Sequence, residues 1–212
     1  MSIKEKTVFS RNADINKTAY LNWRMDSPDD EENMHAMAEA YFLAANILVE
    51  SVLLDNKMHQ ADALIFPIIH AVNQMIELYA KSVIKLINRL NENKTGRSHS
   101  HDIVSLVLEM RGKVIKQECK SKEFDAYIKP LLSYVDEFKQ FANSKHIGMD
   151  FSRYPLDTNG QAQFYVRQSR NIVVDIEFFH QQIKQIRDIL YGLHTMYQEQ
   201  VDCMIQSRYK SV

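Results

Sequence analysis

Glycine and proline are scarce in this chain, whose 212 residues include five Gly and four Pro. Average usage would supply roughly fifteen Gly and ten Pro at this length. Sandwiches and barrels need these residues at many turns, so a turn-rich all-β fold is excluded. The five glycines also lie far apart along the sequence. Phosphate-binding loops need closely spaced glycines, so the Gly-rich dinucleotide and P-loop motifs are excluded as well.

Cysteine, excess charge and long apolar runs are also lacking. Two cysteines, Cys119 and Cys203, are too few for a disulfide scaffold or a Cys-based zinc site, which fits a reducing compartment. The 26 basic and 27 acidic residues nearly cancel, so there is no overall basic surface of the kind that dominates non-specific nucleic-acid binding. No secretory signal is visible, and no apolar run approaches the roughly twenty residues that span a bilayer. We expect a cytoplasmic protein with no membrane partner.

Apolar residues recur at helical spacing along most of the chain. This pattern predicts an all-α bundle of about five helices in a single domain, 31–208, after a polar N-terminal arm, 1–30. Ser27 has the position of an N-cap, Pro67 either lies in the early turns of its helix or kinks it, and Pro130 is expected to bend another. The predicted helices cover about 28–56, 60–91, a stretch from 101 onward, 123–143 and 173–208.

One segment, near 149–166, interrupts the helical pattern. A turn signal at 157–160 separates two short stretches that contain aromatic residues, which predicts a short β-hairpin insert. Arg153 and Tyr154 lie in this insert, and exposed loops often carry binding residues. The alternative is that Tyr154 and Phe151 fix the hairpin onto the bundle.

The last predicted helix carries two patterns side by side. An apolar seam alternates spacings of three and four residues, which is typical of a helix packed in a bundle. Beside it, His180, Arg187 and His194 recur every seven residues, so that neighbours are about 10 Å apart. An Arg between two His is expensive to half-bury without a purpose or a partner. The seam consists of Ile176, Phe179, Ile183, Ile186, Leu190, Leu193 and Tyr197.

The segment from Arg187 to His194 has the form R-x6-H, with Asp188 directly after the Arg. It resembles the motif of the HEPN (higher eukaryotes and prokaryotes nucleotide-binding) superfamily, whose ribonuclease members carry R-x4–6-H, often with a polar residue after the Arg. Gly192 lies inside this segment, where it would let a partner helix or a phosphate approach closely.

Three further segments are similar to HEPN sequences, so that the resemblance covers about 35–208. The helix around 67–81 ends with Glu77 and Lys81 one turn apart, and His101 and Asp102 open the next helix as an "HD" pair does in the family. Residues 152–155 resemble an "RYP" insert of some uncharacterised bacterial relatives.

The resemblance implies a HEPN-like bundle with the activity of a metal-independent endoribonuclease, without a cofactor or a metal, in a toxin–antitoxin or antiphage-defence setting. His194 would act as general base or acid, because its usual pKa lies near neutral pH. Arg187 would stabilise the charge on the phosphate. Asp188 would orient either Arg187 or His194, and His180 would assist or replace His194. Members of the family generally form homodimers, and RNA and a neutralising antitoxin or defence protein are the expected partners. The predicted substrate-binding residues are Arg153, Tyr154 and Arg97.

Other interpretations of the same residues stay open. The chain can be a non-catalytic HEPN-like module for RNA, a nucleotide or a protein partner, in which the stripe of His180, Arg187 and His194 forms structural ion pairs. The absence of a basic surface favours this alternative. Glu32 with His35, and Glu177 with His180, have the Glu-x-x-His spacing of di-iron bundles, although Glu32 lies in the first turn of its helix. The His-rich segment 97–101 suggests a metal or phosphate loop weakly, and a helix start more strongly.

Overall fold

The structure, a computed structural model, describes residues 8–21, 24–91, 100–145, 151–156, 159–160, 163 and 172–209. In these residues the chain forms six α-helices and one short 3-10 helix, Ile15–Lys17, with no β-strand. The all-α prediction is therefore confirmed. The α-helices are α1 (Asp30–Leu54), α2 (Ala61–Leu90), α3 (Ile103–Glu118), α4 (Ser121–Tyr127), α5 (Lys129–Lys145) and α6 (Ile176–Tyr209).

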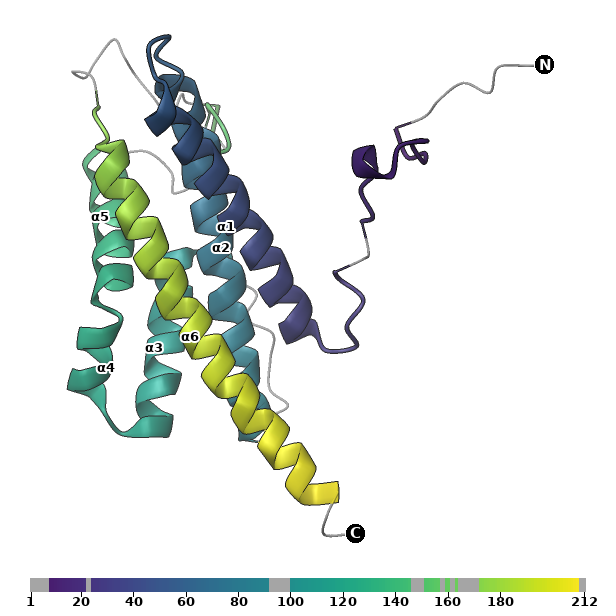
Figure 1. Cartoon of the computed structure of the whole chain (residues 1–212). Helices are drawn as coiled ribbons and strands as arrows, with labels where there is room; N and C mark the ends of the chain where they lie inside the picture. Colours follow the sequence, from purple (N-terminus) through teal and green to yellow (C-terminus); the bar gives the residue numbers. More distant parts are fainter. Residues whose placement is uncertain are drawn as a thin grey trace.

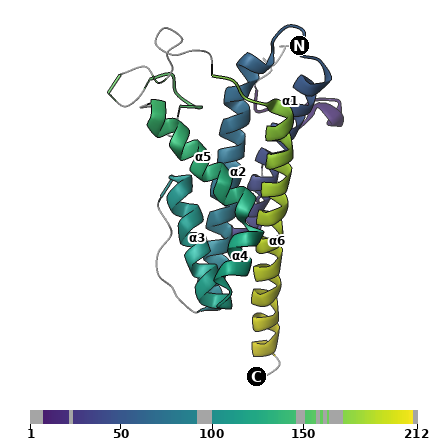
Figure 2. The ribbon, with the colours of Figure 1, turned by 90° about the vertical axis from the view of Figure 1, so that its left-hand side faces the viewer.

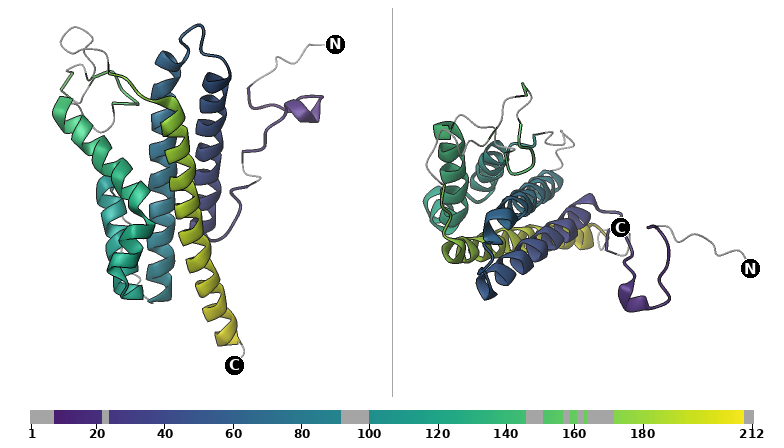
Figure 3. Two further views of the ribbon diagram at one scale, coloured as in Figure 1. Left: turned by 60° about the vertical axis from the view of Figure 1, so that its left-hand side comes forward. Right: turned by 90° about the horizontal axis from the view of Figure 1, so that it is seen from above.

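Helix α2 lies at the centre of the bundle. It packs against α1 and α6 on one side and against α3 on the other, and α5 packs against both α3 and α6. Figure 1 shows that α1 and α6 run in opposite directions, and Figure 2 shows α3, α4 and α5 together on the far side of α2 from α1. The N-terminal arm projects away from the helices (Figure 3).

The core is built mainly from α2 and α6. On α2, Tyr79, Met75 and Ile76 have no exposed surface. On α6, the predicted apolar seam from Phe179 to Tyr197 is buried. The spacing of three and four therefore gave the core-facing side of this helix correctly, because such a stripe stays on one face of a helix.

The helix boundaries differ from the predicted ones near Ser27 and Pro130. Helix α1 begins at Asp30 after Asp29, and the Ser27 hydroxyl donates to Glu32 and accepts from the backbone N–H of Asp29, which lies before the helix. The predicted helix 123–143 is divided into α4 and α5, and Pro130 is the second residue of α5. A proline lacks an N–H and clashes with the preceding turn, so a helix tolerates it best near its start. Pro67, which was expected in the early turns of its helix or at a kink, lies inside α2, near the start of that helix.

The insert is described at 151–156, 159–160 and 163. Phe151 is buried and stacks on Phe138 of α5, with ring centroids 5.2 Å apart. The backbone N–H of Gln163 donates to the carbonyl of Pro155 at 2.8 Å. Phe151 thus fixes the insert to the bundle, whereas Tyr154 is exposed. Residues 157–158 of the predicted turn, and all of the following stretch up to 166 except 163, lie outside the described residues, so the hairpin stays a prediction.

Two helices, α1 and α2, are long and apolar enough to cross a bilayer by length and composition. The sequence analysis found no uninterrupted apolar run of that length. Single charged residues interrupt the runs in α1 and α2, but both helices are still apolar on average. Half of the apolar stretch of α2 is buried (50%), as in a core helix, but only 22% of the stretch of α1 is buried. Helix α1 therefore presents much of its apolar surface outward.

Candidate functional site

The stripe on α6 faces α1, and each of its three residues has a partner there. His180 Nε2 lies 2.8 Å from Asn46 Oδ1, the guanidinium of Arg187 binds the carboxylate of Glu39, and the ring of His194 stacks on that of His35. Because α1 and α6 are antiparallel, the partners follow one another in reverse order along α1. We call these six residues, His35, Glu39, Asn46, His180, Arg187 and His194, the polar seam.

Arg187 makes a bidentate ion pair with Glu39. Its Nε donates to Glu39 Oε1 at 2.9 Å and its Nη2 donates to Oε2 at 2.6 Å. A third donor, Nη1, lies 3.2 Å from Asp188 Oδ1. The guanidinium also lies over the ring of Tyr191, 4.3 Å from its centroid. The donors that would grip a phosphate are therefore already used, and the positive charge is compensated.

The Tyr79 hydroxyl donates a further hydrogen bond to Glu39. Burial opposes ionisation of Glu39, but the hydrogen bonds from Arg187 and Tyr79 lower its pKa below the usual value. The hydrogen bond to Glu39 raises the pKa of Arg187 further. Both members of the pair are thus charged at neutral pH, and α2 supports the pair that joins α1 to α6.

His194 is buried, with 5% of its surface exposed. Its Nδ1 lies 2.9 Å from Ser82 Oγ, which lies 3.0 Å from the carbonyl oxygen of Glu31. The Ser82 hydroxyl has one hydrogen, which it donates to the Glu31 carbonyl, so it can only accept from His194. The neutral His194 ring therefore carries its hydrogen on Nδ1, and its lone pair is on Nε2. Burial lowers the pKa of His194 to about 4, and the neighbouring His35 adds to the effect. A general acid or base works best with a pKa near the working pH, so this environment weakens both roles.

His35 is a seam residue that the sequence analysis considered only as a metal ligand. Its ring is parallel to that of His194, with centroids 4.2 Å apart, and it meets the ring of Tyr79 edge-on. Burial lowers the pKa of His35. Its Nε2 atom is buried and has no hydrogen-bond partner among the residues that the structure describes. The spacing of His35, Glu39 and Asn46 along α1, four and seven residues, was the sequence signal that could have identified this line.

The structure separates His180 from the other predicted catalytic residues. Fourteen residues of helix correspond to about 21 Å, so His180 does not reach His194. Burial lowers the pKa of His180, and Asn46 is its hydrogen-bond partner. This separation does not support the expectation that His180 assists or replaces His194, which stays a prediction. Asp188 is mostly exposed and contacts Arg187 alone among the seam residues.

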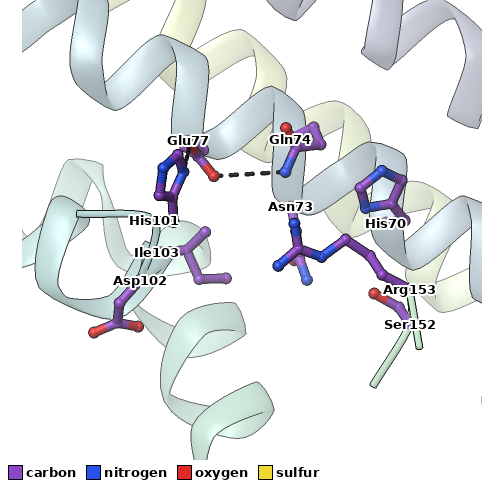
Figure 4. Close-up of a pocket in the computed structure, with 9 residues that line it drawn as sticks. All are labelled: His70, Asn73, Gln74, Glu77, His101, Asp102, Ile103, Ser152 and Arg153. Atoms are coloured by element: carbon purple, nitrogen blue, oxygen red, sulfur yellow. Dashed lines mark hydrogen bonds and ion pairs between the residues drawn. The ribbon is translucent and has the colours of Figure 1, made fainter. Parts of the chain in front are cut away.

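The predicted substrate-binding residues do not join the seam either. Arg153 lines a polar pocket on another side of α2 (Figure 4), and Tyr154 is exposed beside it, with the guanidinium 5.5 Å from its ring centroid. Arg97 lies outside the described residues. The pocket is lined by His70, Asn73, Gln74 and Glu77 of α2, by His101, Asp102 and Ile103 at the start of α3, and by Ser152 and Arg153 of the insert.

Gly192 allows a close approach within the chain. A Cβ atom at this position would lie 2.9 Å from the Tyr127 hydroxyl of α4. That hydroxyl donates to the carbonyl of Ile189 at 3.4 Å. The space at Gly192 is therefore filled by α4, and a partner helix or a phosphate is not needed to explain it.

Among the described residues, no group of three or more His, Cys, Asp or Glu side chains is placed to hold a metal ion. The two Glu-x-x-His segments of the di-iron alternative are both described, and they form no such group. His35 and His180 instead face partners within the polar seam.

The chain matches no protein-family model, no curated protein and no solved structure. The HEPN assignment therefore stays a prediction that rests on the sequence resemblance.

Proposed function

We propose that this chain is a non-catalytic HEPN-like module that binds a second copy of itself through the outer face of α1. The observation that carries the proposal is the exposed apolar surface of that helix. Leu43 and Ile47 are 56% and 55% exposed, although each side chain is fully apolar. A contiguous apolar patch of this kind on a monomer is typical of an interaction surface.

The outer face of α1 has the composition of a helix–helix contact. The segment 40–49 contains no charged residue, and its exposed positions alternate between small and large side chains. Small residues let two helix backbones approach, and large ones fill the adjacent space. We call this surface the α1 face, and it consists of Ala40, Leu43, Ala44, Ile47 and Leu54.

A second copy is the occupant that this surface fits best. In a two-fold dimer the same patch occurs on both subunits and must be complementary to itself. The face is uncharged between Ala40 and Ile47, so this part brings no like charges together, and Glu50 is the exposed charge between Ile47 and Leu54. Helix α1 lies at an edge of the bundle in Figure 3, and Leu43 and Ile47 on it are exposed.

The polar contacts of α1 argue against insertion of this helix into a membrane. Glu39 pairs with Arg187 at mid-helix, and at the start of the helix Asp30 pairs with Lys85 at 2.6 Å. Glu31 is buried and pairs with Arg89 at 3.3 Å. Removing α1 from the bundle would separate all of these charges, which is expensive in an apolar medium.

The test is the oligomeric state of the purified chain, measured by light scattering with size-exclusion chromatography. The wild type should be a dimer, and Leu43→Glu should be a monomer because it brings two buried carboxylates together. Leu108→Glu is the matched control, since Leu108 of α3 is 51% exposed, and it should leave the dimer intact. A monomeric wild type, a dimeric Leu43→Glu variant or recovery of the wild type only in the membrane fraction would each overturn the proposal.

Ribonuclease activity is the second candidate, and one observation favours it. Arg187 and His194 lie in the same seam as His35, whose buried Nε2 lacks a partner among the described residues. An RNA phosphate could supply that partner if Glu39 released Arg187. The bidentate pair and the low pKa of His194 make this the weaker candidate.

RNA cleavage distinguishes the two candidates. We expect the wild type to leave a mixed RNA substrate uncut in the presence of a chelator, at the same background level as Arg187→Ala and His194→Ala. Cleavage by the wild type that is lost in both variants, or toxicity in cells that is lost in both, would establish the ribonuclease instead. Leu108→Glu again serves as the control, because it changes a surface away from the seam.

A further inference from the structure

The polar pocket brings together three segments that are far apart in the sequence. Its lining comes from the middle of α2, from the start of α3 and from residues 152–153 of the insert. Figure 4 shows the side chains of these segments converging on one hollow, with His101 on one side and His70 on the other. The polar seam does not use any of them.

The two sides of α2 keep the pocket and the seam apart. His70, Gln74 and Glu77 are spaced four and three residues apart, so they share one face of the helix. Tyr79, which supports the seam, follows Glu77 by two residues, or about 200° around the helix. A change in the pocket therefore leaves the Arg187–Glu39 pair untouched.

The two acidic residues of the pocket already have partners. Glu77 is buried, and its Oε1 lies 2.7 Å from Lys81 Nζ and 2.9 Å from His101 Nδ1. Asp102 is the N-cap of α3, where its carboxylate accepts from the backbone N–H groups of Val104 and Ser105. Neither carboxylate is thus left to attract a cation into the hollow.

The donors of the pocket, in contrast, are in excess. Arg153 extends into the hollow (Figure 4) and makes no ion pair with a carboxylate among the residues that the structure describes. Glu77 occupies Nδ1 of His101, so Nε2 of this ring is the nitrogen left for a ligand. The amide oxygen of Asn73 accepts from the Tyr134 hydroxyl at 2.8 Å, which leaves its NH₂ group as a donor. Burial and the charge of Arg153 both lower the pKa of His70, so this ring stays neutral beside the arginine.

We propose that this pocket binds the phosphate group of a small phosphate-bearing ligand, with Arg153 and His101 as its main contacts. A guanidinium donates to two phosphate oxygens at once, and a phosphate accepts from several donors arranged around it. Glu77 and Lys81 act as positioning residues, because the carboxylate fixes the His101 ring and the ammonium compensates the charge of that carboxylate. The inference does not depend on dimerisation through the α1 face.

The test is isothermal titration of the full chain with inorganic phosphate, with chloride at equal ionic strength as the blank. The wild type should show saturable binding, and Arg153→Ala should weaken it at least about tenfold, the usual loss for a charged hydrogen-bonded contact. Arg11→Ala is the matched control, because it removes the same charge from the N-terminal arm, where Arg11 contacts Tyr20. His101→Ala should weaken binding as well, and circular dichroism checks that each variant is folded.

The same titration with phenyl phosphate distinguishes the sources of the phosphate group. Tighter binding of phenyl phosphate than of inorganic phosphate supports an organic phosphomonoester as the ligand, and equal binding supports free phosphate. Absence of saturable binding of both probes to the wild type overturns the proposal. So does an equal loss of affinity in Arg11→Ala and Arg153→Ala, since that result would indicate general charge screening.

Discussion

The side chain of His194 ends between the Ser82 hydroxyl and the His35 ring, where water hardly reaches it. Burial lowers its pKa from the usual 6.5 to about 4. As the pH falls, the unfolded chain therefore takes up a proton at His194 before the folded chain does. The free energy of unfolding should be unaffected above about pH 6.5 and should fall by about 3 kcal/mol towards pH 4.

This pH dependence is measured by urea unfolding of the wild type and of His194→Asn. Asparagine keeps a donor near the Nδ1 position, so the contact with Ser82 persists, but it does not titrate. The wild type should lose about 3 kcal/mol relative to His194→Asn between about pH 6.5 and about pH 4. The histidines that do not contact His194 titrate in both proteins and cancel in the difference. Parallel curves for the two proteins would contradict the burial of a neutral His194.

At the scale of helices, sequence patterns predict most of the architecture. Periodic apolar residues locate the long helices, because each must turn one face to the core. The core-facing side of α6 follows from the alternation of three and four in its seam. The division of the predicted helix into α4 and α5 at Ile128 is harder to predict. A proline can bend a continuous helix or begin a new one, and the sequence around it is similar in the two cases.

The partners of the predicted site residues could not be read from the sequence. Arg187 and Glu39 are 148 positions apart, and their contact depends on how α1 and α6 pack. The motif of Arg187 and His194 identified the stripe, but it did not show that Glu39 and Ser82 would occupy it. A stripe of charged and aromatic residues predicts that polar partners exist, and the antiparallel packing decides which residues they are.

For the pocket, too, the sequence identifies the separate segments but not that they meet. Its lining residues lie at 70–77, 101–103 and 152–153, and each of these stretches belongs to a segment that is recognisable in the sequence. Their meeting depends on the start of α3 and the insert both returning to the same face of α2. Phe151, which packs on α5, holds the insert in that place. A short aromatic anchor of this kind is indistinguishable in sequence from an exposed loop residue such as Tyr154.

At the scale of the whole molecule, α1 is an outer helix that the bundle holds by one side. Its inner side packs on α2 and α6, and its outer side is the α1 face. The fully buried apolar residues Ala38, Ala45 and Val49 are small, the larger Tyr41, Phe42 and Leu48 pack partly buried against the core, and polar contacts add to this attachment. Glu39 is the centre of these contacts, because it binds Arg187 of α6 and Tyr79 of α2 at the same time.

Glu39→Gln should therefore loosen the attachment of α1 and lower the free energy of unfolding by about 2 kcal/mol, because it leaves the exposed carboxylate of Asp188 as the counter-charge of the partly buried Arg187. Urea unfolding at neutral pH measures this loss.

Glu50→Gln is the matched control on the same helix, where the exposed carboxylate is not part of the seam, and it should change the stability by less than about 0.5 kcal/mol. The double variant Glu39→Gln with Arg187→Met should recover most of the loss, since it removes the partly buried charge and keeps an apolar stem against Tyr191. Equal stabilities of the Glu39→Gln and Glu50→Gln variants would show that the ion pair does not hold α1 in place.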